Sequence, residues 1–226
     1  DATGFILNLE HTASAAFYLV DIAVGGAGSE QVILANFFVN YVNFSRNSQL
    51  IYIPIAIPAG VRVSARVQSS NAALTDIKAA ITLVGSGFLG GSPYGNSETW
   101  GATLADSGGI QVVPGVNDTK GSYSEIVATS ARDANSLIMC IGNSAADFAL
   151  AAQTYMIDIA TGAAASETVI IPNLLVIAND DDDVFRPAVF GPFPCAIPAG
   201  SRVACRAQAE TGTADNIDVV IVAFSI

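Results

Sequence analysis

Short apolar runs that alternate with polar residues recur along this chain and predict β-strands. The segment 61–68 shows the pattern most clearly, because valine or alanine at every second position alternates with Arg62, Ser64, Arg66 and Gln68. A period of two puts the apolar and polar sets on opposite faces of a strand. Residues 4–9 are expected to form another short strand. No window shows the 3.6-residue period of a long, capped helix, so helix should be minor.

The same pattern occurs twice. Ile57–Gln68 returns as Ile197–Gln208, and in both segments a Pro-Ala-Gly turn precedes the strand. Tyr18 recurs 137 residues later as Tyr155, whereas the Pro-Ala-Gly turn recurs 140 residues later. Three residues have therefore been inserted in the second copy, most simply in the polar loop at 179–183. An insertion in a loop between two apolar strands is what a β scaffold tolerates best.

These runs, rich in Val, Ile and Phe and separated by turn residues, predict an all-β protein. We expect two tandem jelly-roll-like antiparallel β-sandwiches that arise from an internal duplication. Residues 1–85 should form the first sandwich, residues 86–108 a Gly/Ser-rich linker and residues 109–226 the second sandwich. Each copy is expected to end on a core strand, at 77–83 and at 217–223.

The two copies differ at their start. Residues 109–113 and 122–128 predict strands that open the second sandwich, and the first copy has no counterpart to them. A sandwich without its opening strand exposes an apolar seam and unpaired backbone groups. We therefore expect the missing strand to lie upstream of Asp1, to come from the linker, or to be donated by a neighbouring subunit.

The composition and net charge narrow the range of possible binding partners. About half of the residues are hydrophobic (51%), only 13% are charged and the formal net charge is −11. This charge disfavours binding to nucleic acid phosphates and to anionic membrane surfaces. The uncharged stretch at 79–97 is interrupted by five glycines and a proline, so we expect no transmembrane helix there.

Candidate catalytic groups are sparse. Cys140, Cys195 and Cys205 lack a CxxC spacing and are expected to be reduced thiols, with a Cys195–Cys205 disulfide as the alternative. His11 is the only histidine, which excludes a metal site with two histidines and leaves at most one Ser/His/Asp triad. Neither a Gly-x-Ser-x-Gly elbow nor a phosphate-binding glycine loop is present. We expect no enzyme and no cofactor, although a carboxylate pair for glycoside hydrolysis stays open, because such pairs have no local spacing.

Charged residues recur in the two copies. They are Asp21, Glu30, Arg62, Arg66, Asp158, Glu167, Arg202 and Arg206. Arginine binds a carboxylate with two parallel hydrogen bonds, so these residues predict a structural ion-pair network in each sandwich. Arg62 and Arg66 should both be substantially buried and should face Asp21 or Glu30. Twin ligand sites are the alternative.

Two further groups are candidates for binding. The run Asp180, Asp181, Asp182 and Asp183 is a weak calcium candidate, but it lacks the spacing of a calcium loop and a solvated loop is favoured. Tyr94, Trp100 and Tyr123 lie in or near the region between the copies. We expect these aromatic residues in a subunit interface, and glycan stacking is the alternative.

Three sequence motifs resemble those of a known group of proteins. They are Tyr-x-x-Asp-Ile-Ala, then Gly-Ala-x-Ser-Glu-x-Val-Ile, then Ile-Pro-Ala-Gly-x-Arg-Val-x-x-Arg-x-Gln, with the lead-in Thr119–Tyr123. Together they resemble virion structural proteins of tailed bacteriophages. The resemblance implies a component of the virion, such as a capsid decoration (cement) protein, a head fibre or a tail accessory. We expect a homo-oligomer, a trimer, that contacts major capsid or tail proteins. A receptor- or glycan-binding module of a head fibre or tail is the alternative.

Overall fold

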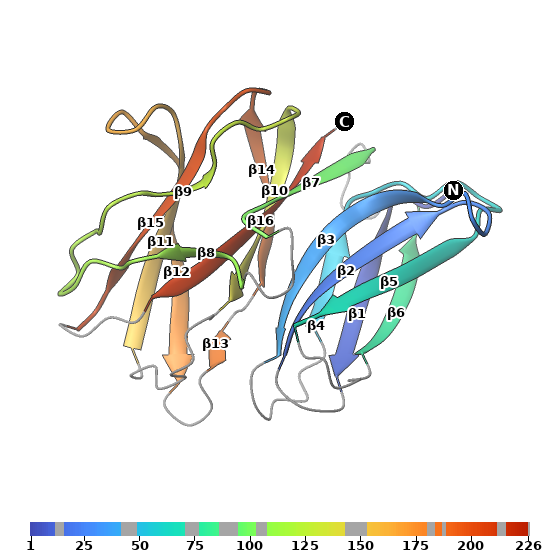
Figure 1. The fold of residues 1–226 in the computed structure, drawn as a ribbon, viewed down its shortest axis with the longest axis horizontal. Coiled ribbons are helices and arrows are strands. Elements are labelled where there is room, and N and C mark those ends of the chain that lie inside the picture. Colours follow the sequence, from blue (N-terminus) through green and yellow to red (C-terminus); the bar gives the residue numbers. More distant parts are fainter. Residues whose placement is uncertain are drawn as a thin grey trace.

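The computed structural model describes residues 1–11, 16–41, 49–70, 77–85, 95–102, 108–142, 153–179, 184–186, 189–211 and 216–225. Every regular element in these ranges is a β-strand, and all strand pairs are antiparallel. The strands form two sandwiches side by side (Figure 1), which confirms the all-β prediction. None of the described segments forms a helix that is long and apolar enough to cross a membrane.

The second sandwich is a complete jelly roll. Its strands are β7 (Asn96–Trp100), β8 (Ile110–Val112), β9 (Ser124–Val127), β10 (Ala134–Gly142), β11 (Gln153–Thr161), β12 (Thr168–Asn179), β13 (Val184–Arg186), β14 (Val189–Ile197), β15 (Val203–Ala209) and β16 (Ile217–Ser225). The pairs β8–β16, β9–β15, β10–β14 and β11–β12 are those of one long antiparallel hairpin. This hairpin is wound up by the further pairs β10–β16 and β11–β15, as in a jelly roll.

The first sandwich has the same winding with fewer strands. They are β1 (Gly4–His11), β2 (Ala16–Val24), β3 (Gln31–Tyr41), β4 (Gln49–Ile53), β5 (Val63–Ser69) and β6 (Ile77–Val84). The sheet orders β4-β1-β6 and β3-β2-β5 match β14-β10-β16 and β12-β11-β15 of the second jelly roll. Register shifts also correspond: they fall at Val20/Ile22 in β2 and at Ile157/Ile159 in β11. A duplication is our interpretation of these matches.

The first jelly roll has no described strands that correspond to β7, β8 and β9. In the described residues β5 pairs only with β2, and β6 pairs only with β1, so both are edge strands. Residues 96–100 of the expected linker form β7, and this strand pairs with β16 of the second jelly roll. The linker prediction is therefore wrong for these residues, and they do not donate the missing strand.

The missing strands leave one side of the first jelly roll open. We call this side the open flank and define it by Ala65, Val67, Ala79 and Leu83, which are all exposed. In the second jelly roll the matching residues of β15 and β16 all point into the core and are buried, because β7, β8 and β9 cover them. The expectation that the first copy ends on a core strand is thus wrong, although Ile77 and Ile81 still pack partly against its core.

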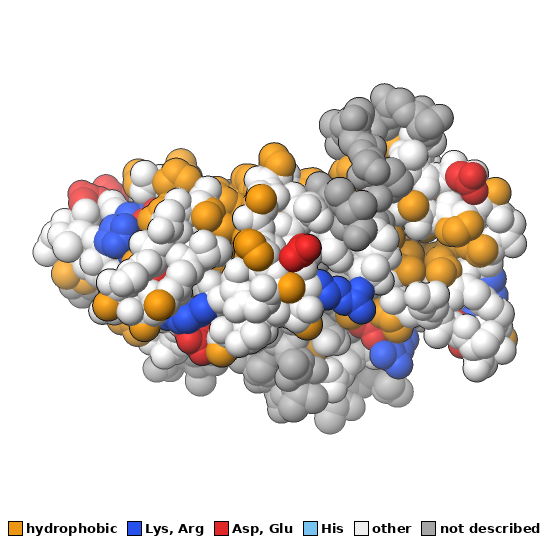
Figure 2. All heavy atoms as spheres, turned by 90° about the horizontal axis from the view of Figure 1, so that it is seen from above, with side chains coloured by type: hydrophobic (Ala, Val, Ile, Leu, Met, Phe, Trp, Pro, Cys, Tyr) orange, Lys and Arg blue, Asp and Glu red, His pale blue; other side chains and the backbone are white. Residues whose placement is uncertain are grey.

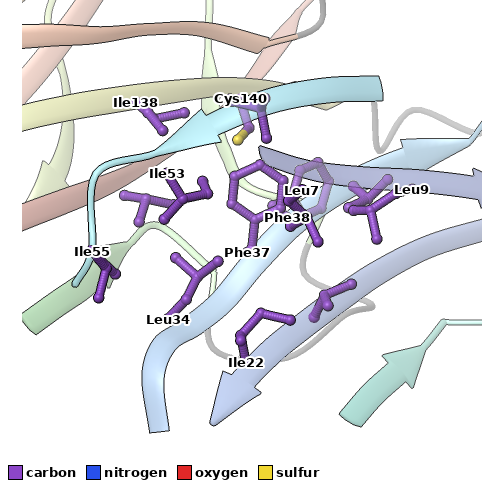
Figure 3. Packing of buried hydrophobic residues seen from close by; sticks show 14 of the residues in the cluster. Leu7, Leu9, Ile22, Leu34, Phe37, Phe38, Ile53, Ile55, Ile138 and Cys140 are labelled. Atoms are coloured by element: carbon purple, nitrogen blue, oxygen red, sulfur yellow. The ribbon is translucent and has the colours of Figure 1, made fainter. Parts of the chain in front are cut away.

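The two jelly rolls share a core. The apolar cluster of the first jelly roll includes Ile138 and Cys140 from β10, which point toward Phe37 and Leu7 (Figure 3). Consequently β10 and β16 are buried on both faces, one against their own sandwich and one against the first. Every residue of β16 is buried. The thiols of Cys140, Cys195 and Cys205 are free, which confirms the prediction of reduced cysteines.

Polar contacts also join the two halves. The Ser97 hydroxyl of β7 accepts a hydrogen bond from the Ala35 N–H and donates one to the Ile33 carbonyl oxygen of β3, at 3.1 and 2.9 Å. The Thr99 hydroxyl donates to the carbonyl oxygen of Ala35. These bonds satisfy backbone groups of β3 where it lies beside β7. The shared core and these bonds hold the sandwiches together as one unit.

Candidate functional site

The recurrent charged residues lie on the outer face of the sheets that contain β5 and β15. We call this the charged face. In the second jelly roll, Asp158 of β11 accepts hydrogen bonds from the Asn173 N–H, the Lys120 ammonium group and the Arg206 guanidinium, each at 2.9 Å. Burial raises the pKa of Asp158, but these three donors together outweigh it and hold the pKa below its ordinary value. This carboxylate is therefore ionised, and it accepts hydrogen bonds from three donors.

Local backbone geometry places an asparagine N–H within hydrogen-bonding distance of each carboxylate. Asn173 has a positive φ of 53°, and Asn36 of the first jelly roll has a φ of 49°. Asparagine tolerates this left-handed conformation better than most residues, which explains its presence at both sites. In the first jelly roll the Asn36 N–H donates to Asp21 at 2.6 Å, as its counterpart does to Asp158. The same sequence signal therefore builds the same carboxylate site twice.

Arg202 completes the network of the second jelly roll. It donates to Glu125 of β9 at 2.7 Å and to Glu167 at 3.0 Å. Its hydrogen bond to Glu125, and then the one to Glu167, raise the pKa of Arg202 although burial opposes the shift. Its side chain is only 16% exposed. Two carboxylates and the Gly162 carbonyl oxygen hold this guanidinium in place.

A segment that precedes β10 lies across this network. We call residues 115–127 the covering segment. Gly115 and Gly121 both donate backbone hydrogen bonds to the Ala207 carbonyl oxygen of β15, at 3.0 and 2.8 Å. Gly121 lies so close to the backbone of residues 113–115 that a Cβ on it would be 2.5 Å from the backbone oxygen of Val113. The ring of Tyr123 stacks on the Arg206 guanidinium, with 4.7 Å between Cζ and the ring centroid.

The first jelly roll has the same ion pairs, and none of its described residues covers them as residues 115–127 cover the second set. Arg66 donates to Asp21 at 2.6 Å, and Arg62 donates to Glu30 at 2.8 Å. The hydrogen bond from Arg62 holds the pKa of Glu30 below its ordinary value. The predicted pairing is thus confirmed, but the predicted burial is wrong: the side chains of Arg66 and Arg62 are 78% and 51% exposed.

Shallow hollows mark the uncovered surface of the first jelly roll. One of about 320 Å³ is lined by residues that include Asp21, Glu30, Arg62 and Arg66. A second, of about 340 Å³, lies beside it against Asn36, Arg66 and neighbouring residues of β2 and β5. The charged face of the first jelly roll is therefore accessible. In the second jelly roll, Lys120, Tyr123 and Glu125 contact the corresponding residues.

Two of the three aromatic residues predicted for binding, Trp100 and Tyr123, pack against other residues of the same chain. Trp100 is 2% exposed in the core of the second jelly roll, so its assignment to a subunit interface or a glycan platform is wrong. Tyr123 is half-buried against Arg206. Tyr94 and the calcium candidates Asp180, Asp181, Asp182 and Asp183 lie outside the described residues, as does the side chain of His11. In the described part, no three Cys, His, Asp or Glu side chains gather as a metal site.

Two participants, Lys120 and Glu125, are absent from the charged residues predicted for the network. Only one copy has them, so recurrence between the copies could not reveal their role. The signal that could have found them is the lead-in Thr119–Tyr123, which runs into the strand predicted over residues 122–128: Lys120 lies in the lead-in and Glu125 in that strand.

Fold and site together define an all-β protein of two joined jelly rolls. In the described residues, the second jelly roll is closed, whereas the first has fewer strands and an exposed charged face. No protein-family model matches this chain, and no curated protein matches its sequence.

Proposed function

We propose that this protein is a structural component of a tailed-phage particle, most simply a capsid decoration protein, which acts by binding other polypeptides. The resemblance of its motifs to virion proteins supports the location. In this proposal it acts as a homo-oligomer, a trimer, on major capsid or tail proteins, and it needs no cofactor. Many copies on one particle would add up to strong attachment without a single tight site.

The observation that carries the proposal is the open flank. In the described part of the chain, a closed jelly roll is joined to one whose strands β5 and β6 each have a single strand neighbour, with exposed apolar side chains on them. Exposed sheet edges are templates for pairing with another chain, and proteins that do not use them usually cover or charge them. Figure 2 shows exposed hydrophobic side chains on the first jelly roll, at the right of the view, with acidic and basic groups among them.

The cysteines fit a structural role better than a catalytic one. Burial raises the pKa of Cys140 to about 12 and that of Cys195 to about 11. Burial also raises the pKa of Cys205, and the nearby Asp158 carboxylate adds to this shift. These thiols are protonated at neutral pH, and a protonated thiol is a poor nucleophile.

The test compares phage particles with and without the protein, for resistance to heat or chelator and for adsorption to cells. A decoration protein predicts a loss of particle stability with unchanged adsorption, and adding the purified protein back should restore stability. The opposite result, normal stability with reduced adsorption, would overturn the proposal in favour of a receptor- or glycan-binding module. The burial of Trp100 argues against that module, because it removes one aromatic ring from any exposed platform.

A further inference from the structure

We propose that the charged face of the first jelly roll binds a primary ammonium group of another molecule. In this site the Asp21 carboxylate and the Leu19 carbonyl oxygen accept hydrogen bonds from the ammonium group, and an aromatic ring joined to it stacks on Arg66. The ligand class is therefore an organic primary amine, and an aromatic one is preferred. Lys120 and Tyr123 supply the same two groups within the second jelly roll. This inference goes beyond the proposed assembly role and does not depend on it.

The second jelly roll shows how such a group is bound. The Lys120 ammonium group donates to the Asp158 carboxylate at 2.9 Å and to the Met156 carbonyl oxygen at 3.1 Å. Oδ1 of Asp158 accepts this bond together with the one from the Asn173 N–H, whereas Oδ2 accepts from Arg206. A carboxylate oxygen has two lone pairs and can accept both bonds. One side chain and one backbone carbonyl of β11 thus hold the ammonium group.

Both acceptors have counterparts in the first jelly roll. The residues 137 positions before them are Leu19 and Asp21 of β2. Oδ1 of Asp21 accepts from the Asn36 N–H and Oδ2 accepts from Arg66, both at 2.6 Å. The carboxylate therefore has the same backbone and guanidinium neighbours, on the same two oxygens, as its counterpart in the second jelly roll. Among the described residues, none donates to Asp21 in the way that Lys120 donates to the second carboxylate.

A hollow lies where the ammonium group would sit. The hollow of about 340 Å³ is lined by residues that include Leu19, Asp21, Asn36 and Arg66, so it reaches both proposed acceptors. The neighbouring hollow of about 320 Å³ also reaches Asp21 and Arg66. Pockets of about 300 Å³ and more hold small organic ligands. The Arg66 side chain is mostly exposed, so an aromatic ring can approach it as Tyr123 approaches its counterpart.

The chain has no lysine of its own for this site. Its two lysines are Lys78 and Lys120. Lys120 binds Asp158, and Lys78 lies on β6, which belongs to the other sheet of the first jelly roll. A lysine-like group at Asp21 must therefore come from another molecule.

The charges favour an ammonium ion over an anion or a metal ion. Arg62 and Arg66 are already paired with carboxylates, at 2.8 and 2.6 Å, and the net charge of −11 attracts cations. A calcium ion takes about six to eight oxygen ligands, whereas the Arg66 guanidinium already occupies one oxygen of Asp21. An ammonium group has only three N–H donors to satisfy, and water can take the third.

The experiment follows the backbone amides of the ¹⁵N-labelled 226-residue protein by NMR during a titration with tyramine, which joins a primary ammonium group to an aromatic ring. The Asn36 amide is the reporter, because its hydrogen bond ends on Oδ1 of Asp21. The Asn173 amide is the internal control, since Lys120 already fills the matching place. We expect a saturable shift of Asn36 with a Kd of about 1–10 mM, as for one ion pair and one ring contact, and no shift of Asn173.

Three further probes separate the parts of the ligand. Butylamine lacks the ring and should bind about two- to fivefold more weakly than tyramine. Tetramethylammonium has the charge without an N–H donor and should not shift the Asn36 amide. Nα-acetyllysine N-methylamide presents the ammonium group as a polypeptide does. Binding as tight as that of butylamine supports a lysine side chain as the natural source, and weaker binding supports a free amine; both results support the inference.

Protein variants test the two binding groups. Asp21→Asn should weaken tyramine binding at least about tenfold, because it removes the charged acceptor. Asp133→Asn is the matched control: its carboxylate also accepts a backbone N–H, from Ala199, but it lies away from the charged face. This variant should bind as the unmodified protein does. Arg66→Gln should abolish the preference for tyramine over butylamine, and it leaves the Asp21 carboxylate in place.

Three results would overturn the inference. The first is the lack of a saturable Asn36 shift at about 50 mM tyramine, about five times the upper end of the expected Kd. The second is an equal shift with tetramethylammonium, which would reduce the effect to general charge attraction. The third is unchanged tyramine binding in Asp21→Asn while the Asn173 amide shows that the fold is intact. None of these results bears on particle stability, so the proposed assembly role is tested separately.

Discussion

The two jelly rolls place related strands in opposite environments. Every residue of β16 is buried, whereas none of β6 is. Ile81 and Ile221 are the same residue at the same place in the winding, yet only Ile221 is fully buried. The difference comes from the neighbours: β7 and β8 pair with β16, and its other face lies against the first jelly roll. Burial is thus set by the strands that cover a position as much as by its own residue type.

The charged faces differ for the same reason. Asp158 and Asp21 each contact an arginine and a backbone N–H, but only Asp158 gains a lysine from the covering segment. Their arginines are 31% and 78% exposed. Solvent weakens the attraction between charges, and exposed ion pairs contribute little to stability. The second network should therefore stabilise its sheet more than the first.

The largest expected effect is in the core. Ile221→Ala should lower the free energy of unfolding by roughly 2–5 kcal/mol, because it leaves a cavity between fully packed strands. Ile81→Ala should cost only about 1 kcal/mol, since less of that side chain leaves water on folding. Urea unfolding followed by circular dichroism measures both variants. Equal losses would mean that the first jelly roll is closed in solution, and the comparison would fail.

The second effect concerns the acidic residues of the charged faces. Asp158→Asn should destabilise the protein by about 2–3 kcal/mol, because it leaves Lys120 and Arg206 without their shared carboxylate in a half-buried site. Asp21→Asn should cost at most about 1 kcal/mol, since Arg66 stays hydrated. The same unfolding measurement compares the two variants. A larger loss for Asp21→Asn would contradict the role assigned to the covering segment.

Most of the fold follows from local patterns in the sequence. Alternation at 61–68 and the Pro-Ala-Gly turns identify β5 and β15, and the repeated motifs identify β2, β3, β11 and β12. No specific strand was predicted at β10. Its residues Leu137–Ile141 form a continuous apolar run, because both faces are buried between the two jelly rolls. Such a run has no period that distinguishes a strand from a buried helix.

The sequence predicted that the arginines of the candidate site bind carboxylates, but it did not predict how exposed to solvent these side chains are. Recurrence predicted that Arg62 and Arg66 face Asp21 or Glu30, and the structure shows which pairs form: Arg66 with Asp21 and Arg62 with Glu30. Recurrence could not show which copy is covered, because Lys120, Tyr123 and Glu125 approach the charged face only through the path of the covering segment. That path depends on close backbone crossings at Gly115 and Gly121, which are a property of the tertiary fold.

The third prediction tests this crossing. Gly121→Ala puts a Cβ within 2.7 Å of the backbone nitrogen of Gly115, so the covering segment must shift. We expect a loss of about 1–3 kcal/mol, as for other overpacked sites, and faster hydrogen exchange in β15. Gly85→Ala in the first jelly roll is the control, because a Cβ there meets nothing within 4 Å. The control should change stability by less than about 0.5 kcal/mol. Unchanged exchange in β15 after Gly121→Ala would show that the segment does not hold this edge.

The smallest effect is a dependence on pH. The pKa of Asp158 is lower in the folded protein than its ordinary value, so the unfolded chain takes up this proton at higher pH than the folded one. The stability that this carboxylate contributes is complete above about pH 4 and is lost as pH falls through the folded pKa. The difference in unfolding free energy between the unmodified protein and Asp158→Asn should accordingly be constant from pH 6 to 8. Below about pH 4 it should shrink by at most about 1.4 kcal/mol per pH unit, the limit for one proton. A difference that stays constant down to about pH 2 would mean that the charge of Asp158 contributes nothing to stability.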